Sequence, residues 1–394
     1  MTKMFKKSLL SLALASLCGT AAAADVQVFG FFDQGVAFLN EHLAVGMGGP
    51  NAAKQQTFKP GQTQLQLADL KNSFTQGTGN VNTFGFKASE QINDDLTVAI
   101  HLEQGFFSDS GEEYIKGIGF ERESSIALNS KSYGQLKLGR MPALTTGSGT
   151  TGIFNSRVNP FGAGYGNMTG GWKFVGTLAS ARHNNMINYI SPTVNGVTIH
   201  AQHSFGDTKD DALEGSTDVN RFSAIGMTVK GENYFIAAAV DWLKMGQKTG
   251  AVTDDSYKAI VGGHYNFGSF KAYATAEYMK NLQYIGGYST KEFAVKLDGQ
   301  SKTKGFDGWA LSTGFDTNVG KGKAMFSVGY GQGENQNLAD NNEYKRMNVG
   351  IGYRYPMSKQ TSLYAVSGYF WEDADYIEDN IYASEVILGL MHRF

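Results

Sequence analysis

The chain has 394 residues, one cysteine and a formal net charge of −2 at pH 7. Its 34 basic residues are offset by 36 acidic ones, and this balance gives no reason to expect a nucleic acid as a partner. With 50 glycines, only 6 prolines, 12% aromatic and 18% charged residues, the composition favours one large β-barrel over two soluble domains.

Residues 1–24 have the three-part layout of a secretory signal peptide. Lysines precede an apolar run over 8–17, and a run of small residues ends at Ala24. The apolar run is too short to span a bilayer as a helix. We expect cleavage after Ala24, which leaves 25–394 as the mature domain. The only cysteine, Cys18, lies in the signal, so we expect no disulfide in the mature chain.

The mature chain reads as about sixteen strand-like segments of roughly ten residues, the length that a tilted strand needs to cross a bilayer. In 96–103, apolar side chains alternate with small or polar ones. Segment 258–267 alternates in the same way except at Ile260, whereas 234–240 is apolar on both faces. Because a barrel strand shows only half of its side chains to lipid, a mean hydropathy of −0.27 is compatible with membrane insertion.

The junctions between these segments alternate between short and long. Short turn-like pieces fall at 93–95, 131–133, 192–196, 231–233, 267–269, 320–322 and 357–359, and longer polar stretches at about 41–80, 107–119, 142–181, 207–220, 244–256, 282–305, 334–343 and 373–382. A sixteen-strand barrel whose two chain ends both lie in the periplasm needs this arrangement. The sequence therefore predicts an all-β, transmembrane antiparallel β-barrel.

The carboxyl end supports this prediction. Val386, Leu388, Leu390, His392 and Phe394 fall on one face of the last segment. We expect a lipid-facing final strand that ends in an aromatic residue at the membrane interface.

Five segments of the chain resemble the general diffusion porins of β-proteobacterial type. They are Val26 to Gly35, Phe84 to Glu90, Gly134 to Arg140, Asn185 to Pro192 and Met391 to Phe394. The resemblance implies a sixteen-stranded barrel in the outer membrane, a homotrimer, and a third external loop folded into the lumen as its narrowest point. It also implies a water-filled channel for passive diffusion of small hydrophilic solutes and ions, in contact with outer-membrane lipid and lipopolysaccharide.

The stretch from Pro142 to Ala181 is the candidate for this constriction loop. It contains Arg157 and Lys173 but no Asp or Glu, whereas the family pattern often places acidic groups here. Basic candidates for the facing wall are Lys87, Arg122, Arg140 and Arg182, and acidic lumen candidates are Asp33, Glu103 and Glu123. A loop with basic but no acidic residues, opposite arginines, predicts a weak preference for anions.

Strand parity gives different expectations for two of these arginines. Arg182 is an even number of positions from the polar Asn188, so on a regular strand both side chains point into the lumen. Arg140 has the parity of Leu138, which faces lipid in a regular strand. It remains a candidate because Gly139 precedes it at the strand end, where a bulge can redirect a side chain.

The outer loops contain acidic runs at 207–211, 254–255 and 372–375. These carboxylates would favour cations at the mouth, or bind divalent ions that bridge to lipopolysaccharide. Simple solvated loop charge is the alternative interpretation.

Two motifs are set aside, and we expect no cofactor and no metal. The GxGxxG match at 147–152 is not followed by a helical pattern, which dinucleotide binding requires. His200 and His203 point to opposite faces of a strand and cannot chelate one ion together.

Two other functional classes remain as alternatives. One is an outer-membrane barrel that acts mainly as an adhesin or surface-binding protein, which would bind a surface without conducting. The other is a barrel enzyme, which would need a Ser and a His of matching parity on adjacent strands, and no GxSxG elbow is present.

Overall fold

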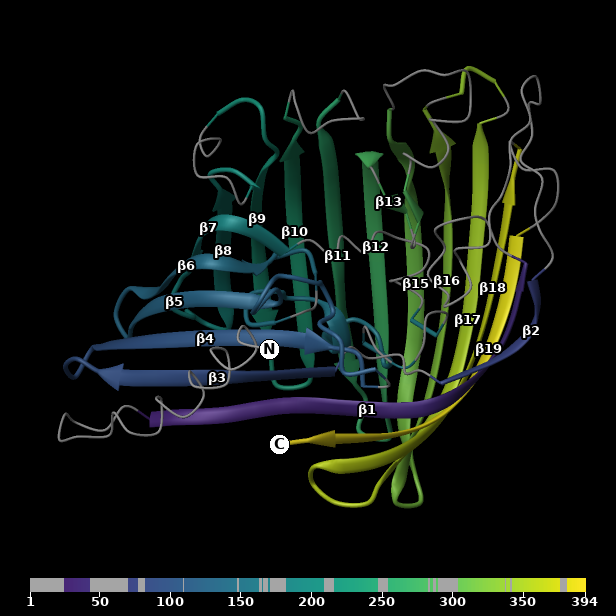
Figure 1. Ribbon diagram of the computed structural model, residues 1–394, viewed down its shortest axis with the longest axis horizontal. Helices are drawn as coiled ribbons and strands as arrows, with labels where there is room; N and C mark the ends of the chain where they lie inside the picture. Colours follow the sequence, from purple (N-terminus) through teal and green to yellow (C-terminus); the bar gives the residue numbers. More distant parts are fainter. Residues whose placement is uncertain are drawn as a thin grey trace, which may run out of the picture.

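The computed structural model describes residues 25–42, 70–76, 82–108, 110–146, 149–162, 165, 169–170, 182–208, 216–246, 254–282, 284–285, 288–289, 304–336, 338–340, 342–375 and 381–394. The expected signal peptide and Lys173 lie outside the described residues. Within these ranges the chain is almost entirely β-strand (Figure 1). No helix in the described part is long and apolar enough to cross a membrane.

In the described ranges, the strands follow one another along the chain with a single short 3-10 helix, η1 (Asn155–Arg157). They are β1 (Asp25–His42), β2 (Leu70–Gln76), β3 (Asn82–Gln91), β4 (Leu96–Phe106), β5 (Glu123–Ser130), β6 (Gly134–Pro142), β7 (Arg182–Ile190), β8 (Val197–Ser204), β9 (Arg221–Lys230), β10 (Tyr234–Lys244), β11 (Ser256–Asn266), β12 (Phe270–Leu282), β13 (Tyr284–Ile285), β14 (Tyr288–Ser289), β15 (Phe306–Val319), β16 (Gly322–Asn335), β17 (Glu343–Pro356), β18 (Thr361–Ala374) and β19 (Ile381–Arg393).

All strands except the small β13–β14 pair form one sheet that closes on itself. Each strand pairs antiparallel with its neighbours, and the first strand pairs with the last, from Phe31 opposite Arg393 to His42 opposite Tyr382. β3 pairs with the first half of β1 and β2 with its second half, so β2 and β3 share one position. The seventeen strands of the sheet therefore occupy sixteen positions, which confirms the predicted barrel.

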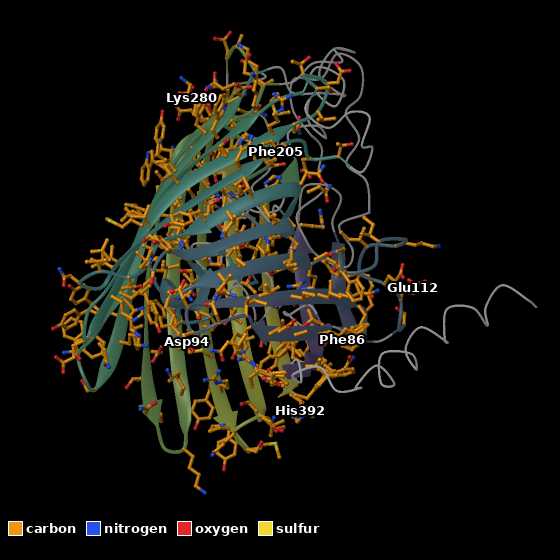
Figure 2. All side chains as sticks on the ribbon, turned by 90° about the vertical axis from the view of Figure 1, so that its left-hand side faces the viewer. Phe86, Asp94, Glu112, Phe205, Lys280 and His392 are labelled. Atoms are coloured by element: carbon orange, nitrogen blue, oxygen red, sulfur yellow. The ribbon has the colours of Figure 1, made fainter. Side chains whose placement is uncertain are left out.

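The short and long connections lie at opposite ends of the barrel, as the sequence predicts. The seven predicted short turns each join two neighbouring strands, and the predicted long stretches fall between the other pairs. In Figure 2, Asp94 and His392 lie at the short-turn end, and Phe205 and Lys280 lie at the loop end. We call these the turn end and the loop end.

Strand alternation separates a lipid-facing outer surface from a polar inner face. On β4, Ile100 is 42% exposed on the outside, whereas its neighbour His101 is only 9% exposed on the inside. On the last strand, Val386, Leu388 and Leu390 are exposed on the outer face, as expected. The lumen is therefore lined mainly by the small or polar residues that alternate with the apolar, lipid-facing ones.

The carboxyl terminus closes the seam between β1 and β19. Gly30 N donates to Phe394 O at 2.9 Å, and Phe394 N donates to Gly30 O at 3.1 Å. The Phe394 ring covers Gly30, because a Cβ at that position would lie 2.1 Å from a ring carbon. A side chain at position 30 would displace the ring from this contact.

Deletion of Phe394 should weaken this seam. It removes two backbone hydrogen bonds and a half-buried ring, so we expect the free energy of unfolding to fall by about 2–4 kcal/mol. Urea titration in detergent micelles, followed by tryptophan fluorescence, measures the change. Tyr133→Ala is the control, because this ring is 78% exposed at a short turn. An equal loss of stability in both variants would contradict the role of the seam.

Candidate pore constriction

The connection between β6 and β7 enters the barrel and begins by binding the inner wall of β8 and β10. Leu144 N donates to Gln202 Oε1 at 2.6 Å. Thr145 Oγ1 donates to Asp241 Oδ2 at 2.6 Å, and Asp241 also lies 3.6 Å from Lys258 Nζ. These contacts fix the start of the loop against the wall. The constriction loop that the resemblance implied is therefore present inside the lumen.

The middle of the loop packs an apolar cluster against the inner wall. Loop residues Ile153, Phe154 and Val158 are all buried there, among inward-facing residues of β9, β10 and β11. Those wall residues include Ala237, Ala239 and Ile260. Segment 234–240 is therefore apolar on both faces, and Ile260 interrupts the alternation, because the loop covers the inner wall at these positions.

The far end of the described loop contacts the opposite side of the barrel, near the seam. Tyr165 meets the ring of Tyr364 edge-on, with ring centroids 5.1 Å apart, and Tyr364 Oη donates to Asp33 Oδ1 at 2.8 Å. Further along, Ser327 Oγ donates to Thr169 O at 2.6 Å. The loop thus spans the lumen from β6 to β16, β18 and β1, and it narrows the channel.

Inward-facing glycines make room for the loop along its path. A Cβ at Gly350 would lie 2.4 Å from Thr169 O, and one at Gly352 would lie 2.9 Å from the Phe161 ring. Three further inward glycines face loop residues Leu144, Val158 and Pro160 in the same way: Gly226, Gly262 and Gly314. We call these five glycines the glycine seat.

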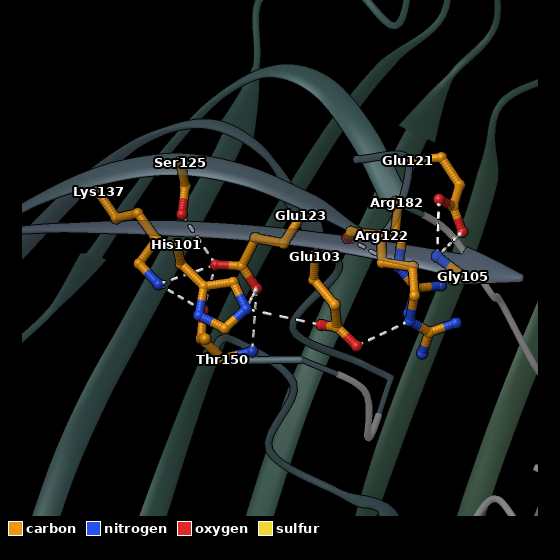
Figure 3. Close-up of polar contacts among 10 residues, drawn as sticks. All are labelled: His101, Glu103, Gly105, Glu121, Arg122, Glu123, Ser125, Lys137, Thr150 and Arg182. Carbon is orange, nitrogen blue, oxygen red and sulfur yellow. Dashed lines mark hydrogen bonds and ion pairs between the residues drawn. The ribbon is translucent and has the colours of Figure 1, made fainter. Parts of the chain in front are cut away.

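Side chains on β4, β5 and β6, together with Arg122 just before β5, form a row of acidic and basic groups on the inner wall (Figure 3). Arg122 Nε lies 2.9 Å from Glu103 Oε1, and Glu103 Oε2 lies 3.6 Å from His101 Nε2. His101 Nε2 is also 4.0 Å from Glu123 Oε2, and Lys137 Nζ is 3.1 Å from Glu123 Oε1. We call these five residues the charge ladder.

Two residues of the charge ladder, Glu123 and Lys137, bind the loop. Thr150 of the loop donates to Glu123 through its backbone N at 3.2 Å and through its Oγ1 at 2.6 Å, and Lys137 also donates to Thr150. The sequence pointed to Arg122, Glu103 and Glu123 but missed Lys137. Alternation with the lipid-facing Leu138 was the signal that could have placed Lys137 inside.

Arg140 and Arg182 lie where the β6–β7 register is irregular. The register shifts after Gly139, whose φ is 126°, so the bulge anticipated beside Arg140 exists. Arg140 donates to Glu121 O at 2.7 Å and to Asn184 Oδ1 at 2.8 Å.

The parity argument for Arg182 assumes a regular strand. Asn185 has a φ of 53° and interrupts the regular alternation between Arg182 and Asn188. Arg182 Nε donates to Arg122 O at 2.9 Å. Like Arg140, Arg182 therefore joins backbone segments, and neither placement follows from counting positions along a regular strand.

The remaining candidates lie in different parts of the lumen. Lys87 is exposed on β3, with its Nζ 4.3 Å from the Phe29 ring centroid. Asp33 is fully buried beneath Tyr364, away from the charge ladder. Arg157 is exposed on the loop, and its backbone O accepts from His264 Nδ1 at 2.7 Å. Partial burial lowers the pKa of the Arg157 guanidinium, which remains a cation at neutral pH.

The acidic runs expected in the outer loops are partly structural. Glu372 is not in a loop: it lies on β18, fully buried, 2.7 Å from Arg346 Nε. Asp255 accepts from Trp242 Nε1 at 3.0 Å. Burial would raise the pKa of Asp207, but hydrogen bonds from His183 and from the backbone of Asn184 hold that pKa below its ordinary value.

No three His, Cys, Asp or Glu side chains gather as metal ligands in the part of the chain that the structure describes. His200 contacts Thr228 Oγ1, and His203 contacts Ser223 Oγ. The two histidines thus have separate partners, in agreement with their opposite parity.

A closed barrel with a lipid-facing exterior, a polar lumen and an inward loop defines a membrane channel. The family model described as Gram-negative porin matches residues 10–375, so the chain belongs to this family and forms an outer-membrane channel for passive diffusion of small hydrophilic solutes and ions. An outer membrane porin protein of Bordetella pertussis is 29% identical over 412 residues, which cover 99% of this chain and 100% of the relative.

Solved structures share the fold. The anion-selective porin from Comamonas acidovorans matches with a TM-score of 0.62 and 18% identity, over 94% of this chain and 100% of that one. OmpT of Vibrio cholerae, in its trimer form, matches with a TM-score of 0.58 and 14% identity, over 94% and 100% of the two chains.

Glu123→Gln should loosen the middle of the loop. The substitution leaves Lys137 without a carboxylate and weakens both bonds from Thr150, so we expect a loss of about 3–5 kcal/mol of stability and larger fluctuations of the open-channel current. Chemical denaturation and single-channel recording measure the two effects. Glu90→Gln, at an exposed position on β3, is the control. Unchanged current noise in a folded Glu123→Gln protein would contradict the anchor.

Gly350→Val should displace the loop from the glycine seat. The new side chain would collide with the loop backbone at Thr169 rather than with a neighbouring strand, so we expect a folded barrel with a changed, larger single-channel conductance. Gly119→Val, where a Cβ meets open space, should leave the conductance unchanged. A wild-type conductance in Gly350→Val would show that the loop is not seated there.

Proposed function

We propose that this porin is a homotrimeric channel with a weak preference for anions, that residues 1–24 direct its export, and that transport involves no covalent chemistry. The observation that carries the anion preference is the exposed Arg157 on the constriction loop. Among the described residues, no carboxylate lies within ion-pair distance of this guanidinium. Its positive charge therefore acts on the ions that pass.

The surrounding wall supports a weak rather than a strong preference. In the charge ladder, Arg122 is paired with Glu103 and Lys137 with Glu123. Paired charges at short distance largely cancel for an ion in the water-filled lumen. Among the described residues, this leaves Arg157 on the loop, and Arg140 and Arg182 beside the charge ladder, as cations without a carboxylate at ion-pair distance. The similar fold described as an anion-selective porin is consistent with a preference for anions.

The trimer and the lipid contacts rest on the outer surface and on the comparisons. Exposed aromatic and aliphatic side chains cover the outer face of the barrel, and they suit outer-membrane lipid, lipopolysaccharide or a neighbouring subunit. One of the similar structures is a trimer form. The proposal of transport without catalysis is supported by the charge ladder, whose groups bind each other and the loop.

The reversal potential of the purified protein in a KCl gradient across a planar bilayer tests the preference. We expect an anion-selective sign for the wild type, and a shift toward zero or toward cations in Arg157→Gln. Ser156→Ala, at the exposed neighbouring position, should keep the wild-type value. Cation selectivity of the wild type would overturn the preference and leave the channel assignment intact.

The same recordings test the oligomer. Closures in three equal steps are expected from a trimer, and single-step closures at all voltages would contradict it.

A further inference from the structure

We propose that the turn-side half of the lumen is a binding site for multivalent anions. The site consists of Lys271, Lys323 and Arg354 around Asp316, on four adjacent strands. It lies on the opposite side of the constriction loop from the outer mouth. It is separate from the charge ladder and from Arg157.

The strand register places these residues in one inward-facing row. Lys271 on β12 lies opposite Asp316 on β15. Lys323 on β16 lies directly opposite Arg354 on β17, and Lys323 Nζ is 2.7 Å from Asp316 Oδ1. Neighbouring strands are about 4.8 Å apart, so Lys323 and Arg354 lie within reach of one anion. Lys271 lies three strand positions from Arg354, roughly 14 Å away, within reach of a longer anion with several charged groups.

The row has more positive than negative charge. Asp316 also accepts from Tyr273 Oη at 2.5 Å, so one carboxylate serves a hydroxyl and the ammonium of Lys323. Arg354 has no carboxylate within 4.0 Å among the described residues, and its Nη1 donates to Tyr165 Oη of the loop at 3.3 Å. Like charges directly opposite on adjacent strands repel, so an anion between Lys323 and Arg354 would relieve an unfavourable contact.

Buried carboxylates are concentrated in the other half of the barrel. Within the described strands, those in the loop-side half are Glu103, Glu123, Asp241, Glu277, Glu372 and Glu385. In the turn-side half, the described strands have two buried carboxylates, Asp33 and Asp316. Two further cations, Lys87 and Arg393, are exposed near the turn end. The lumen is therefore polarised along its axis, with unbalanced positive charge on the turn side.

The geometry selects the class of ligand. A guanidinium and an ammonium that face each other across a strand pair suit the oxygens of phosphate or carboxylate groups. Lys323 has a side chain that is 30% exposed, so the site is open to water and an anion must gain more than one contact to be retained. An anion with two or three charged groups can bridge Lys323, Arg354 and Lys271, whereas chloride cannot.

Tripolyphosphate block of single channels tests the site. The sequence has no cysteine other than Cys18, so Ser269→Cys in the exposed short turn, labelled from one chamber with a membrane-impermeant thiol reagent, reports the orientation of each channel. We expect discrete blockages that are more frequent when tripolyphosphate enters from the turn side. From the loop side, the anion must first pass the constriction.

A paired variant and its control decide the assignment. In Lys323→Gln/Arg354→Gln we expect the blockage lifetime to fall about tenfold, which corresponds to about 1.4 kcal/mol. Lys345→Gln removes a cation from the outer face of β17, the strand of Arg354, and should leave the lifetime unchanged. The absence of side-dependent block, or an equal effect of both variants, would overturn the site.

This outcome is distinguishable from failure of the proposed function. The inference requires an open lumen but not the preference set by Arg157. A cation-selective reversal potential together with side-dependent tripolyphosphate block would contradict only the proposed anion preference. An anion-selective reversal potential without block would sink only the turn-side site. A folding check of the double variant by heat-dependent gel mobility precedes the recordings, and Lys271→Gln alone provides a milder substitution with a smaller expected effect.

Discussion

In a hydrocarbon layer, no water is present to pair with backbone N–H and C=O groups, so each must find a partner in the chain. The pairing of β1 with β19 meets this constraint, because it leaves the sheet without an edge. Once the sheet is closed, the outer face meets lipid and the inner face meets water. The apolar exterior, the polar lumen and the space for an internal loop all depend on this closure.

The internal loop must also be packed, inside the closed barrel. It must bind a wall that elsewhere faces water, and it does so with apolar side chains over alanines and Ile260, with backbone approaches at the glycine seat, and with hydrogen bonds to Gln202, Asp241 and Glu123. The inner wall is therefore not uniform. It is small and apolar where the middle of the loop packs, and polar or charged where the loop is hydrogen-bonded.

Much of the fold could be predicted from the sequence because it depends on local, periodic signals. Alternation identified the strands, and the lengths of the junctions gave their number and direction. The two exceptions to the pattern, 234–240 and Ile260, were informative, because they mark where the loop covers the wall. One sequence could not reveal that contact, since it joins residues about a hundred positions apart.

The placement of charged residues was less predictable for physical reasons. Counting parity assumes a regular strand, and the irregular backbone at Gly139 and Asn185 breaks that assumption at Arg140 and Arg182. The charge of a side chain also does not show whether it forms an ion pair. Glu372 reads as a loop acid, yet it lies on β18 beside Arg346.

The far anchor of the loop links the filter to the ends of the chain. The Tyr165 ring contacts Tyr364, and its Oη lies 3.9 Å from Met391 Sδ. Tyr364 in turn donates to Asp33, which is 331 residues away in the sequence. These partners belong to β18, β1 and β19, which become neighbours only when the seam closes. Contacts between such distant parts of a chain are slow to form. A barrel in which β1 has not yet paired with β19 would therefore lack the far anchor of the constriction loop. Only the fully closed barrel would then select solutes by size.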